Sequence, residues 1–284
     1  YERTSSLVGS EMCIRDRCIQ SGYTPKKGEP RVLPIYQSTT FKYDTSDQMG
    51  RLFDLEDTGY FYTRLQNPTN DAVAAKICDL EGGVGAMLTS SGQAANFYAM
   101  FNICEAGGHI VASSAIYGGT YNLLGTTMKK LGIDCTFVSP EADEAELQAA
   151  IRPNTKLIFG ETISNPTLEV LDIELFARVA HKNGIPLVVD NTFATPINCR
   201  PFEFGADIVV HSTTKYMDGH ATQVGGCIVD SGNFDWMAHK DKFPGLTTKD
   251  ESYHGIIYAE KFGKMAYITK CTTQLMRDLG SIPS

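Results

Sequence analysis

The middle of the chain alternates between two hydrophobic periods, one typical of strands and one typical of helices. Short apolar runs predict strands at 85–89, 109–112, 135–138, 156–160, 186–189 and 206–210. Apolar positions three and four residues apart predict helices at 94–104, 121–131, 144–151 and 173–183. Strands separated by helices of this length indicate right-handed βαβ units. The predicted fold class is therefore α/β, with a mainly parallel sheet flanked by helices.

One further helix precedes the first strand. Thr69 or Asn70 can cap its N-terminus, because such side chains accept hydrogen bonds from exposed backbone N–H groups. Gly82-Gly83 ends it, since glycine readily adopts the left-handed conformation that follows a helix. A last helix is predicted at 265–279, after which the chain stops at 280–284. This abrupt end leads us to expect that a closing C-terminal domain is missing.

The other end of the chain does not resemble natural protein sequence. The segment from Glu11 to Arg17 matches a reading frame through a transposon-end adapter used in library preparation. Residues 1–17 are therefore expected to be an adapter-derived artefact and are excluded from the fold prediction.

Composition narrows the class of partner. With 284 residues, 42% of them hydrophobic, the chain can bury one large core and little of a second domain. A formal net charge of −8 without a dense Lys/Arg block argues against nucleic-acid and acidic-membrane partners. No apolar run approaches the roughly 20 residues that cross a bilayer, and no signal-peptide pattern is present. The expected location is cytoplasmic, and small-molecule chemistry fits best.

The spacing of the cysteines and histidines indicates whether a metal site is expected and in which redox compartment the chain resides. Eight cysteines include no C-x-x-C pair, and several lie in apolar helix or strand patterns, so we expect buried thiols in a reducing compartment. Six scattered histidines form no H-x-x-H or H-E-x-x-H motif. No metal site is predicted.

Two polar side chains follow predicted strands. Asp190 comes directly after 186–189, and Lys215 follows 206–210 after a short polar stretch. Ligands bind at the carboxyl ends of parallel strands, so both side chains are expected to face one crevice. Pyridoxal phosphate (PLP) needs a lysine amine for its Schiff base and a carboxylate at its ring nitrogen, so this pair suggests PLP. The alternative is that both are solvated loop residues.

A second chemical signal is the small-residue turn 90–93 between a strand and a helix. Free N–H groups at such a helix start can hold a phosphate. Ser212 and Thr214 flank Lys215 and add hydroxyl donors that can reach the same phosphate. The turn is neither a Walker loop nor a Rossmann fingerprint. Alone, it equally fits a helix cap, and the two hydroxyls equally fit a polar turn.

Six short motifs occur in a fixed order. They are FYTRLQNPT at 61–69, SSGQAA at 90–95, YGGTY at 117–121, SNPT at 164–167, DNTF at 190–193 and HSTTKY at 211–216. In this order they resemble the motifs of the Cys/Met-metabolism PLP-dependent enzymes of fold type I, from about residue 18 to the end. The resemblance implies an N-terminal arm at 18–62, an aspartate-aminotransferase-like PLP-binding large domain at 63–260, and the start of a truncated C-terminal domain at 261–284.

The resemblance also implies roles for individual residues. Lys215 would carry PLP as a Schiff base and then move protons between the amino-acid substrate and the cofactor. Asp190 would pair with the pyridine nitrogen, and Asn165 would bond near the ring hydroxyl. Tyr117 would stack on the ring and assist proton transfer, although on residue type alone it fits a buried aromatic.

The implied phosphate site and assembly are linked. The phosphate would lie on the residues Gly92, Gln93, Ser212 and Thr214. Tyr62 and Arg64 would reach it from a neighbouring subunit, so the active site would be shared across a dimer interface. Such dimers would pair into a homotetramer.

Within the family, the closest likeness is to the O-acetylhomoserine sulfhydrylases, PLP-dependent transferases of methionine and cysteine metabolism. These imply γ-replacement on O-acetyl-L-homoserine by sulfide, giving homocysteine and acetate. Methionine γ-lyases typically carry a cysteine where this chain has Gly119. Cystathionine γ-synthases share YGGTY, but residues 243–255 look like the extended segment of the sulfhydrylases. Both remain alternatives.

Two interpretations from other classes stay open. A Rossmann nucleotide enzyme shares the α/β pattern, yet no glycine fingerprint follows a predicted strand. A PLP-binding but catalytically incompetent fragment is the other, because the family's substrate-carboxylate arginine lies in the C-terminal domain that we expect to be missing.

Overall fold

One seven-stranded sheet organises the computed structural model, which describes residues 14–54 and 56–283. Its strands are β1 Gly85–Thr89, β2 His109–Ser113, β3 Asp134–Val138, β4 Thr155–Glu161, β5 Leu187–Asp190, β6 Ile208–His211 and β7 Gly226–Asp230. Their order is β1-β7-β6-β5-β4-β2-β3. The run from β6 to β3 pairs in parallel, whereas β7 runs antiparallel to both β1 and β6. The mainly parallel α/β prediction is confirmed, and β7 is a strand that the sequence pattern did not predict.

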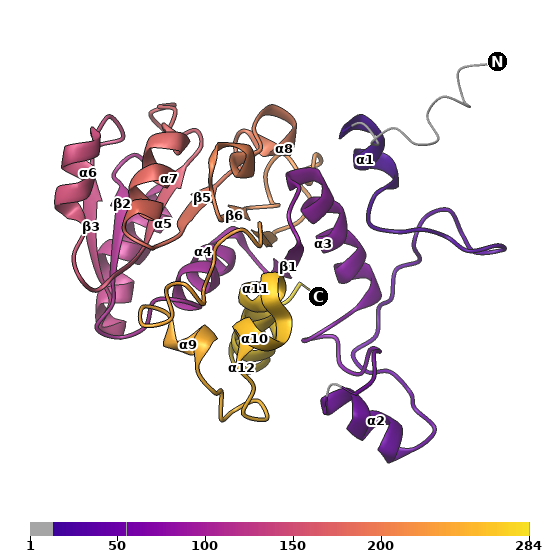
Figure 1. The fold of residues 1–284 in the computed structure, drawn as a ribbon. Coiled ribbons are helices and arrows are strands. Elements are labelled where there is room, and N and C mark those ends of the chain that lie inside the picture. The colour runs from indigo at the N-terminus through magenta and orange to yellow at the C-terminus, as the bar shows by residue number, and fades with distance from the viewer. Residues whose placement is uncertain (1–13, 55, 284) are drawn as a thin grey trace, which may run out of the picture.

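Helices flank the sheet along its length, except α1 and α2 on the N-terminal segment, which stand away from it (Figure 1). They are α1 Ile14–Gln20, α2 Ser46–Phe53, α3 Pro68–Glu81, α4 Gly92–Phe101, α5 Gly118–Asn122, α6 Glu144–Ala150, α7 Ile173–Lys182, α8 Thr195–Asn198, α9 Pro244–Thr247, α10 Tyr258–Phe262, α11 Ala266–Lys270 and α12 Arg277–Leu279. The helix predicted at 121–131 starts earlier, at α5, and reaches Leu131 through a wide π turn and a tight 3₁₀ turn. The helix predicted at 265–279 likewise contains a π turn, at 271–276.

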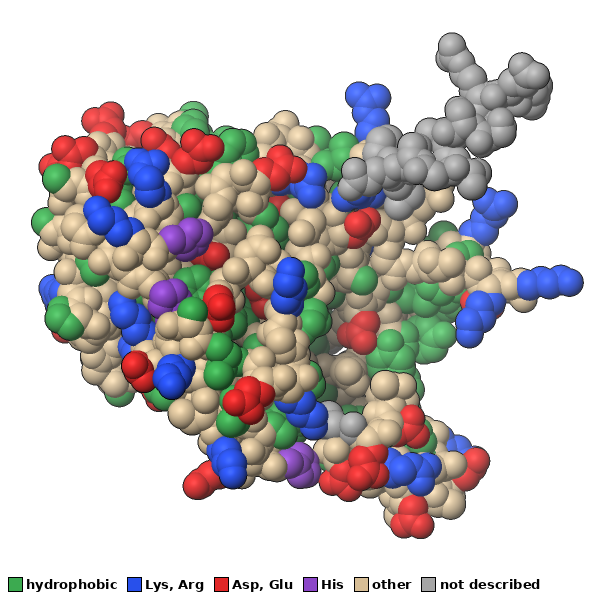
Figure 2. Space-filling model, in the orientation of Figure 1, with side chains coloured by type: hydrophobic (Ala, Val, Ile, Leu, Met, Phe, Trp, Pro, Cys, Tyr) green, Lys and Arg blue, Asp and Glu red, His purple; other side chains and the backbone are tan. Residues whose placement is uncertain are grey.

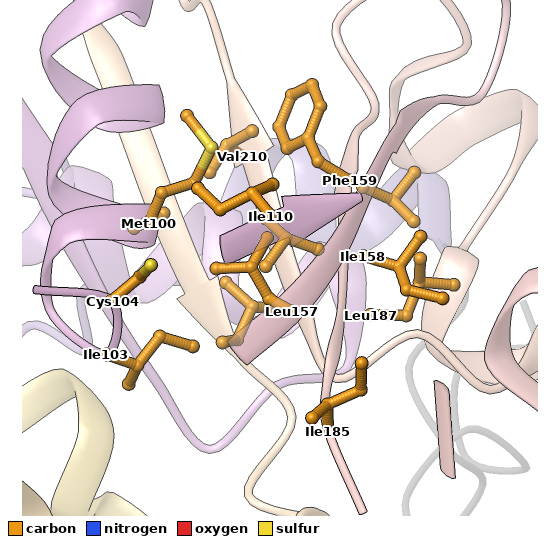
Figure 3. Packing of buried hydrophobic residues seen from close by; sticks show 14 of the residues in the cluster. Met100, Ile103, Cys104, Ile110, Leu157, Ile158, Phe159, Ile185, Leu187 and Val210 are labelled. Atoms are coloured by element: carbon orange, nitrogen blue, oxygen red, sulfur yellow. The ribbon is translucent and has the colours of Figure 1, made fainter. Parts of the chain in front are cut away.

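The core occupies both faces of the sheet, because successive strand residues point to opposite faces. On β6, Val209 packs in a cluster with Ile77 of α3, whereas Val210 packs in a cluster with Met100 of α4. Figure 3 shows Met100 near Ile110 of β2 and Val210 of β6. The central parallel strands are therefore buried on both sides, which matches their continuous apolar sequences.

The N-terminal segment stands away from the sheet (Figure 1). Residues 1–13 of the expected artefact lie outside the described residues, while 14–17 belong to α1. There the Arg17 guanidinium donates to the Asp79 carbonyl at 3.1 Å. Beyond α1 the chain is extended; Ile19 of α1 is 78% exposed, and Val32 and Ile35 of the extended part are 80% and 82% exposed.

The remaining sequence expectations concern cysteines and membranes. The seven cysteines in the described part of the chain are free, and Cys78, Cys104, Cys227 and Cys271 are buried. Cys18 is exposed, so the expectation of buried thiols is wrong for that residue, which lies in α1 at the surface. None of the helices that the structure describes has the length and apolar character needed to cross a bilayer.

The cap of α3 differs from the predicted one. Asn67, rather than Thr69 or Asn70, is the N-cap, and its Oδ1 accepts the Thr69 N–H at 2.9 Å. Pro68 explains the shift, since proline favours the first helical position, where its missing N–H costs nothing. Asn67 Nδ2 also donates to the Tyr36 carbonyl at 2.9 Å, which ties the N-terminal segment to the helix. At the other end Gly82 takes a left-handed conformation, as predicted.

We therefore expect Asn67→Ala to lower the free energy of unfolding by about 1–2 kcal/mol, because both the cap and the bond to Tyr36 are lost. Asn70→Ala is the matched control, with an expected loss below about 0.5 kcal/mol for a site without the cap. Urea unfolding followed by circular dichroism measures both. Equal losses in the two variants would contradict the assignment of the cap to Asn67.

Candidate active site

Asp190 ends β5 at the carboxyl edge of the sheet. Its Oδ1 accepts the Thr192 N–H at 3.0 Å and the Thr192 hydroxyl at 2.5 Å. Its Oδ2 accepts the side-chain amide of Asn96 of α4 at 3.4 Å. The Thr192 hydroxyl in turn accepts the Ser212 N–H at 2.8 Å. The carboxylate of Asp190 is therefore fixed in place and connected to the segment that follows β6.

A second carboxyl group, Glu161, ends the neighbouring strand β4 and pairs in register with Asp190. Burial raises the pKa of Glu161 to about 8, the negative charge of Asp190 adds to the rise, and hydrogen bonds from the backbones of Tyr117 and Asn165 oppose it. The Tyr117 N–H donates to Glu161 Oε1 at 2.7 Å. Sequence reasoning missed Glu161, although it directly follows a predicted strand in the same way as Asp190.

Tyr117 precedes α5, and its side chain is half exposed at the same edge. A Cβ atom at Gly119 would lie 2.5 Å from Cε1 of the Tyr117 ring and 2.9 Å from Nε2 of Gln93. The Thr120 hydroxyl donates to Oε1 of Gln93 at 3.0 Å. The position of the Tyr117 ring therefore depends on glycine at 119, and α5 is joined to the start of α4.

The turn predicted to hold phosphate lies at the start of α4. Ser91 caps the helix by accepting the Ala94 N–H at 3.1 Å, so the helix begins at Gly92, two residues before the predicted start. The backbone N–H groups of Gly92 and Gln93 have no acceptor among the described residues. A Cβ atom at Gly92 would lie only 2.5 Å from Cβ of Ser212. Glycine thus lets two free N–H groups and a serine side chain converge, as an anion site requires.

Thr214 and Lys215 are placed differently from their neighbour Ser212. The Thr214 hydroxyl accepts the N–H of Gly225 at 3.0 Å and donates to its carbonyl at 3.2 Å, so it is already engaged. Lys215 is exposed and lines an open hollow of about 860 Å³ with Phe193, Tyr216 and residues 219–224. In the part of the chain that the structure describes, Lys215 and Asp190 share no hydrogen bond or ion pair. The lysine therefore lies at the rim of the site.

Tyr62 and Arg64 contact each other and the C-terminal segment. The Arg64 guanidinium stands 5.2 Å above the Tyr62 ring and donates to the backbone carbonyl of Arg277. Across residues 14–54 and 56–283, no hydrogen bond joins either side chain to Gly92, Gln93 or Ser212. In this structure the two side chains therefore make no hydrogen bond to the turn of their own chain.

A buried polar network lies beneath the site. Nε2 of His211, the last residue of β6, lies 2.6 Å from Oε1 of Glu81 in α3, and both side chains are fully buried. Asn191, directly after β5, donates to the same oxygen at 2.8 Å and accepts the Thr162 hydroxyl at 2.8 Å. The ends of β4, β5 and β6 are thereby joined to one helix.

Glu161 makes stability depend on pH. Its folded-state pKa of about 8 lies above the ordinary value of 4.5, so its stabilising contribution is complete below pH 4.5 and is lost as the pH rises through about 8. Glu161→Gln removes this titration. We expect the variant to gain stability relative to the native chain between pH 5 and pH 8, by on the order of 2 kcal/mol.

Urea unfolding at both pH values measures this difference. Asp230 is also buried, with a pKa raised to about 7, but it is present in both proteins and its effect cancels. A stability difference that stays constant between pH 5 and pH 8 would contradict the raised pKa of Glu161.

Comparison with known proteins identifies the family. The profile of the family described as "Cys/Met metabolism PLP-dependent enzyme" matches residues 16–279. The chain is 48% identical over 254 residues to the O-acetyl-L-homoserine sulfhydrylase of Corynebacterium glutamicum, covering 88% of this chain and 58% of that protein. It is 46% identical over 251 residues to the homocysteine synthase of Schizosaccharomyces pombe, with the same coverages. The chain thus spans somewhat more than half the length of these relatives.

A solved structure agrees in fold. A Campylobacter jejuni protein, crystallised with an N′-pyridoxyl-lysine-5′-monophosphate residue, matches with a TM-score of 0.91 at 33% identity, over 96% of this chain and 67% of that one. The family profile covers nearly all of the described residues, and the fold agrees over almost the whole chain. This chain therefore belongs to the Cys/Met-metabolism PLP-dependent enzymes.

Proposed function

We propose that this chain is the PLP-binding part of an O-acetylhomoserine sulfhydrylase, which exchanges the γ-acetoxy group of O-acetyl-L-homoserine for sulfide and yields homocysteine and acetate. The carrying observation is the convergence of Asp190, the start of α4 and Ser212 at one sheet edge, in a chain 48% identical to a sulfhydrylase. Cytoplasmic action is part of the proposal, supported by the free thiols of the described cysteines.

The residues at this edge fit PLP. The two unpaired N–H groups at the start of α4 and Ser212, which lies too close to Gly92 for any larger residue there, supply donors for a phosphate. Asp190, held by Thr192 and Asn96, supplies a fixed carboxylate for the ring nitrogen. When bound, PLP acts as an electron sink for negative charge on substrate carbons.

The chain's own residues supply binding and proton transfer. Asp190 holds its charge near the ring nitrogen, and the half-exposed Tyr117 ring offers a face for stacking. Lys215, at the rim, has the solvent access that an amine needs to hold the cofactor and then carry protons to and from the substrate. Asn165 is proposed to bond near the ring hydroxyl. Thr214 would reach the phosphate only by exchanging its bonds to Gly225.

The assembly and domain boundaries belong to the same proposal. The arm at 18–62 precedes the large domain at 63–260, and a C-terminal domain begins at 261–284. Tyr62 and Arg64 would complete the phosphate site of a neighbouring subunit within a homotetramer. The lack of a hydrogen bond from either side chain to their own turn supports this, as do three apolar side chains of the arm that are about four-fifths exposed. Figure 2 shows the arm projecting from the body of the molecule.

The methionine γ-lyase alternative is disfavoured by one contact. A cysteine at 119 would place its Cβ 2.5 Å from the Tyr117 ring, so the ring would have to move. Cystathionine γ-synthase remains the second candidate, because such enzymes carry the same YGGTY motif as this chain.

The assignment of Lys215 can be tested with PLP and borohydride. We expect a visible absorption band, and after reduction a pyridoxyl mass on the peptide that contains Lys215. Lys215→Ala is expected to lose the adduct, whereas Lys240→Ala, which changes an exposed lysine, keeps it. An adduct on another lysine of the native chain would contradict the assignment.

Turnover should be assayed in parallel, with sulfide and with cysteine as sulfur donors. Because the chain covers 58% of its relatives, the assay includes a chimera completed with the C-terminal segment of the Corynebacterium protein. We expect homocysteine from O-acetylhomoserine and sulfide, with loss of at least about 10³-fold in the Lys215→Ala chimera. Cystathionine formation from cysteine instead would favour the second candidate.

The proposed phosphate site leads to a separate prediction about the affinity for PLP. Gly92→Ala places a methyl group against Ser212, so the affinity for PLP is expected to fall at least about 10-fold, the equivalent of one lost charge-assisted hydrogen bond. Gly50→Ala is the control, because a Cβ atom there meets nothing within 4 Å. Absorbance titration with PLP measures both variants. Equal affinities would rule out a phosphate at this turn.

A further inference from the structure

We propose that Glu161 is a positioning residue of the PLP site: its carboxyl group holds the backbone of Tyr117 and lies beside Asn165, and so positions the segments that flank the ring. This inference rests on the proposed function for its catalytic meaning. The hydrogen bonds that support it are made within this chain and do not involve the cofactor.

The position of Glu161 follows from strand pairing. Glu161 and Asp190 are register partners at the ends of parallel strands, so their side chains leave the sheet on the same face. Asp190 is held by Thr192 and Asn96. The glutamate is one methylene longer and makes a different contact, with the backbone N–H of Tyr117 at 2.7 Å. Two adjacent carboxyl groups therefore have separate partners.

The first segment that Glu161 holds begins at Tyr117. No side chain of the segment itself caps α5, so the N–H of Tyr117 would have no acceptor without the carboxyl group of β4. An unsatisfied N–H of this kind favours rearrangement of the local backbone. The Tyr117 ring is attached to this backbone, and its position therefore depends on Glu161.

The second segment runs from Ser164 to Glu169 and is internally cross-linked. The Ser164 N–H donates to the Glu169 carbonyl at 2.9 Å, and the Glu169 N–H donates to the Ser164 hydroxyl at 3.0 Å. The segment is thus held together internally, and its Asn165 backbone lowers the pKa of Glu161, which places it beside this carboxyl group. The carboxyl group of Glu161 therefore holds Tyr117, 44 residues away in sequence, and lies beside a second segment that starts 3 residues after it.

Amide hydrogen exchange of the chain without PLP tests the contact directly. In Glu161→Ala we expect the Tyr117 amide to exchange at least about 10-fold faster, because its acceptor is lost. Glu161→Gln keeps an acceptor oxygen and should stay near the native rate at Tyr117. Glu169→Gln, a charge-removing control in the same segment, should leave the Tyr117 amide unchanged.

Protection of β4, β5 and β6 shows whether each variant is folded. If Glu161→Ala loses this protection, Glu161→Asp decides, because its shorter side chain keeps a carboxyl group but does not reach Tyr117. Native exchange at Tyr117 in the folded alanine variant, or in the aspartate variant where that one decides, would overturn the proposal.

The same variants in the PLP-loaded chimera report on function. We expect Glu161→Ala to retain PLP but to lose about 10²-fold in kcat, with most of this restored in Glu161→Gln. If native protein neither binds PLP nor turns over O-acetylhomoserine, the proposed function fails while the exchange result still stands. Native kcat in the alanine variant would overturn the positioning role.

Discussion

The arrangement of the candidate site depends on three strands that end at the same edge of the sheet. β4, β5 and β6 finish at one edge of the sheet, and the network of Glu81, His211, Asn191 and Thr162 joins them there. These groups are fully or almost fully buried, so each depends on its hydrogen bonds to offset the cost of leaving water. A shift of one strand would break several bonds at once, and the strand ends therefore form a fixed platform.

The residues of the candidate site are positioned by these strand ends. Asp190 and Glu161 stand on neighbouring strands and have different partners: Asp190 is held by Thr192 and Asn96 and is proposed to face the cofactor ring, whereas Glu161 accepts the backbone N–H of Tyr117. Ser212 follows β6 and meets the start of α4, where Gly92 leaves room for it. A charge-bearing ring and a phosphate need fixed donors several ångströms apart, and strand ends beside a helix start provide them.

Much of this was visible in the sequence, because buried parallel strands and amphipathic helices leave strong periodic signals. β1 begins and ends at the predicted residues, and Asp190 ends its strand as expected. β7 was missed, since no helix separates it from β6 and its apolar run of three residues, Cys227 to Val229, gives little signal. The cap of α3 was misplaced by two or three residues because the preference of Pro68 for the first helical position was overlooked. Glu161 could have been found by the rule that found Asp190, but its contact with Tyr117 depends on tertiary packing, as does the engagement of Thr214 with Gly225.

The most direct test of the central claim is a crystal structure of the chain soaked with PLP. The account predicts the phosphate on the N–H groups of Gly92 and Gln93 beside Ser212, with the ring nitrogen within hydrogen-bonding distance of Asp190. PLP bound in the hollow beside Lys215 without contact to Asp190 or to the start of α4 would contradict it.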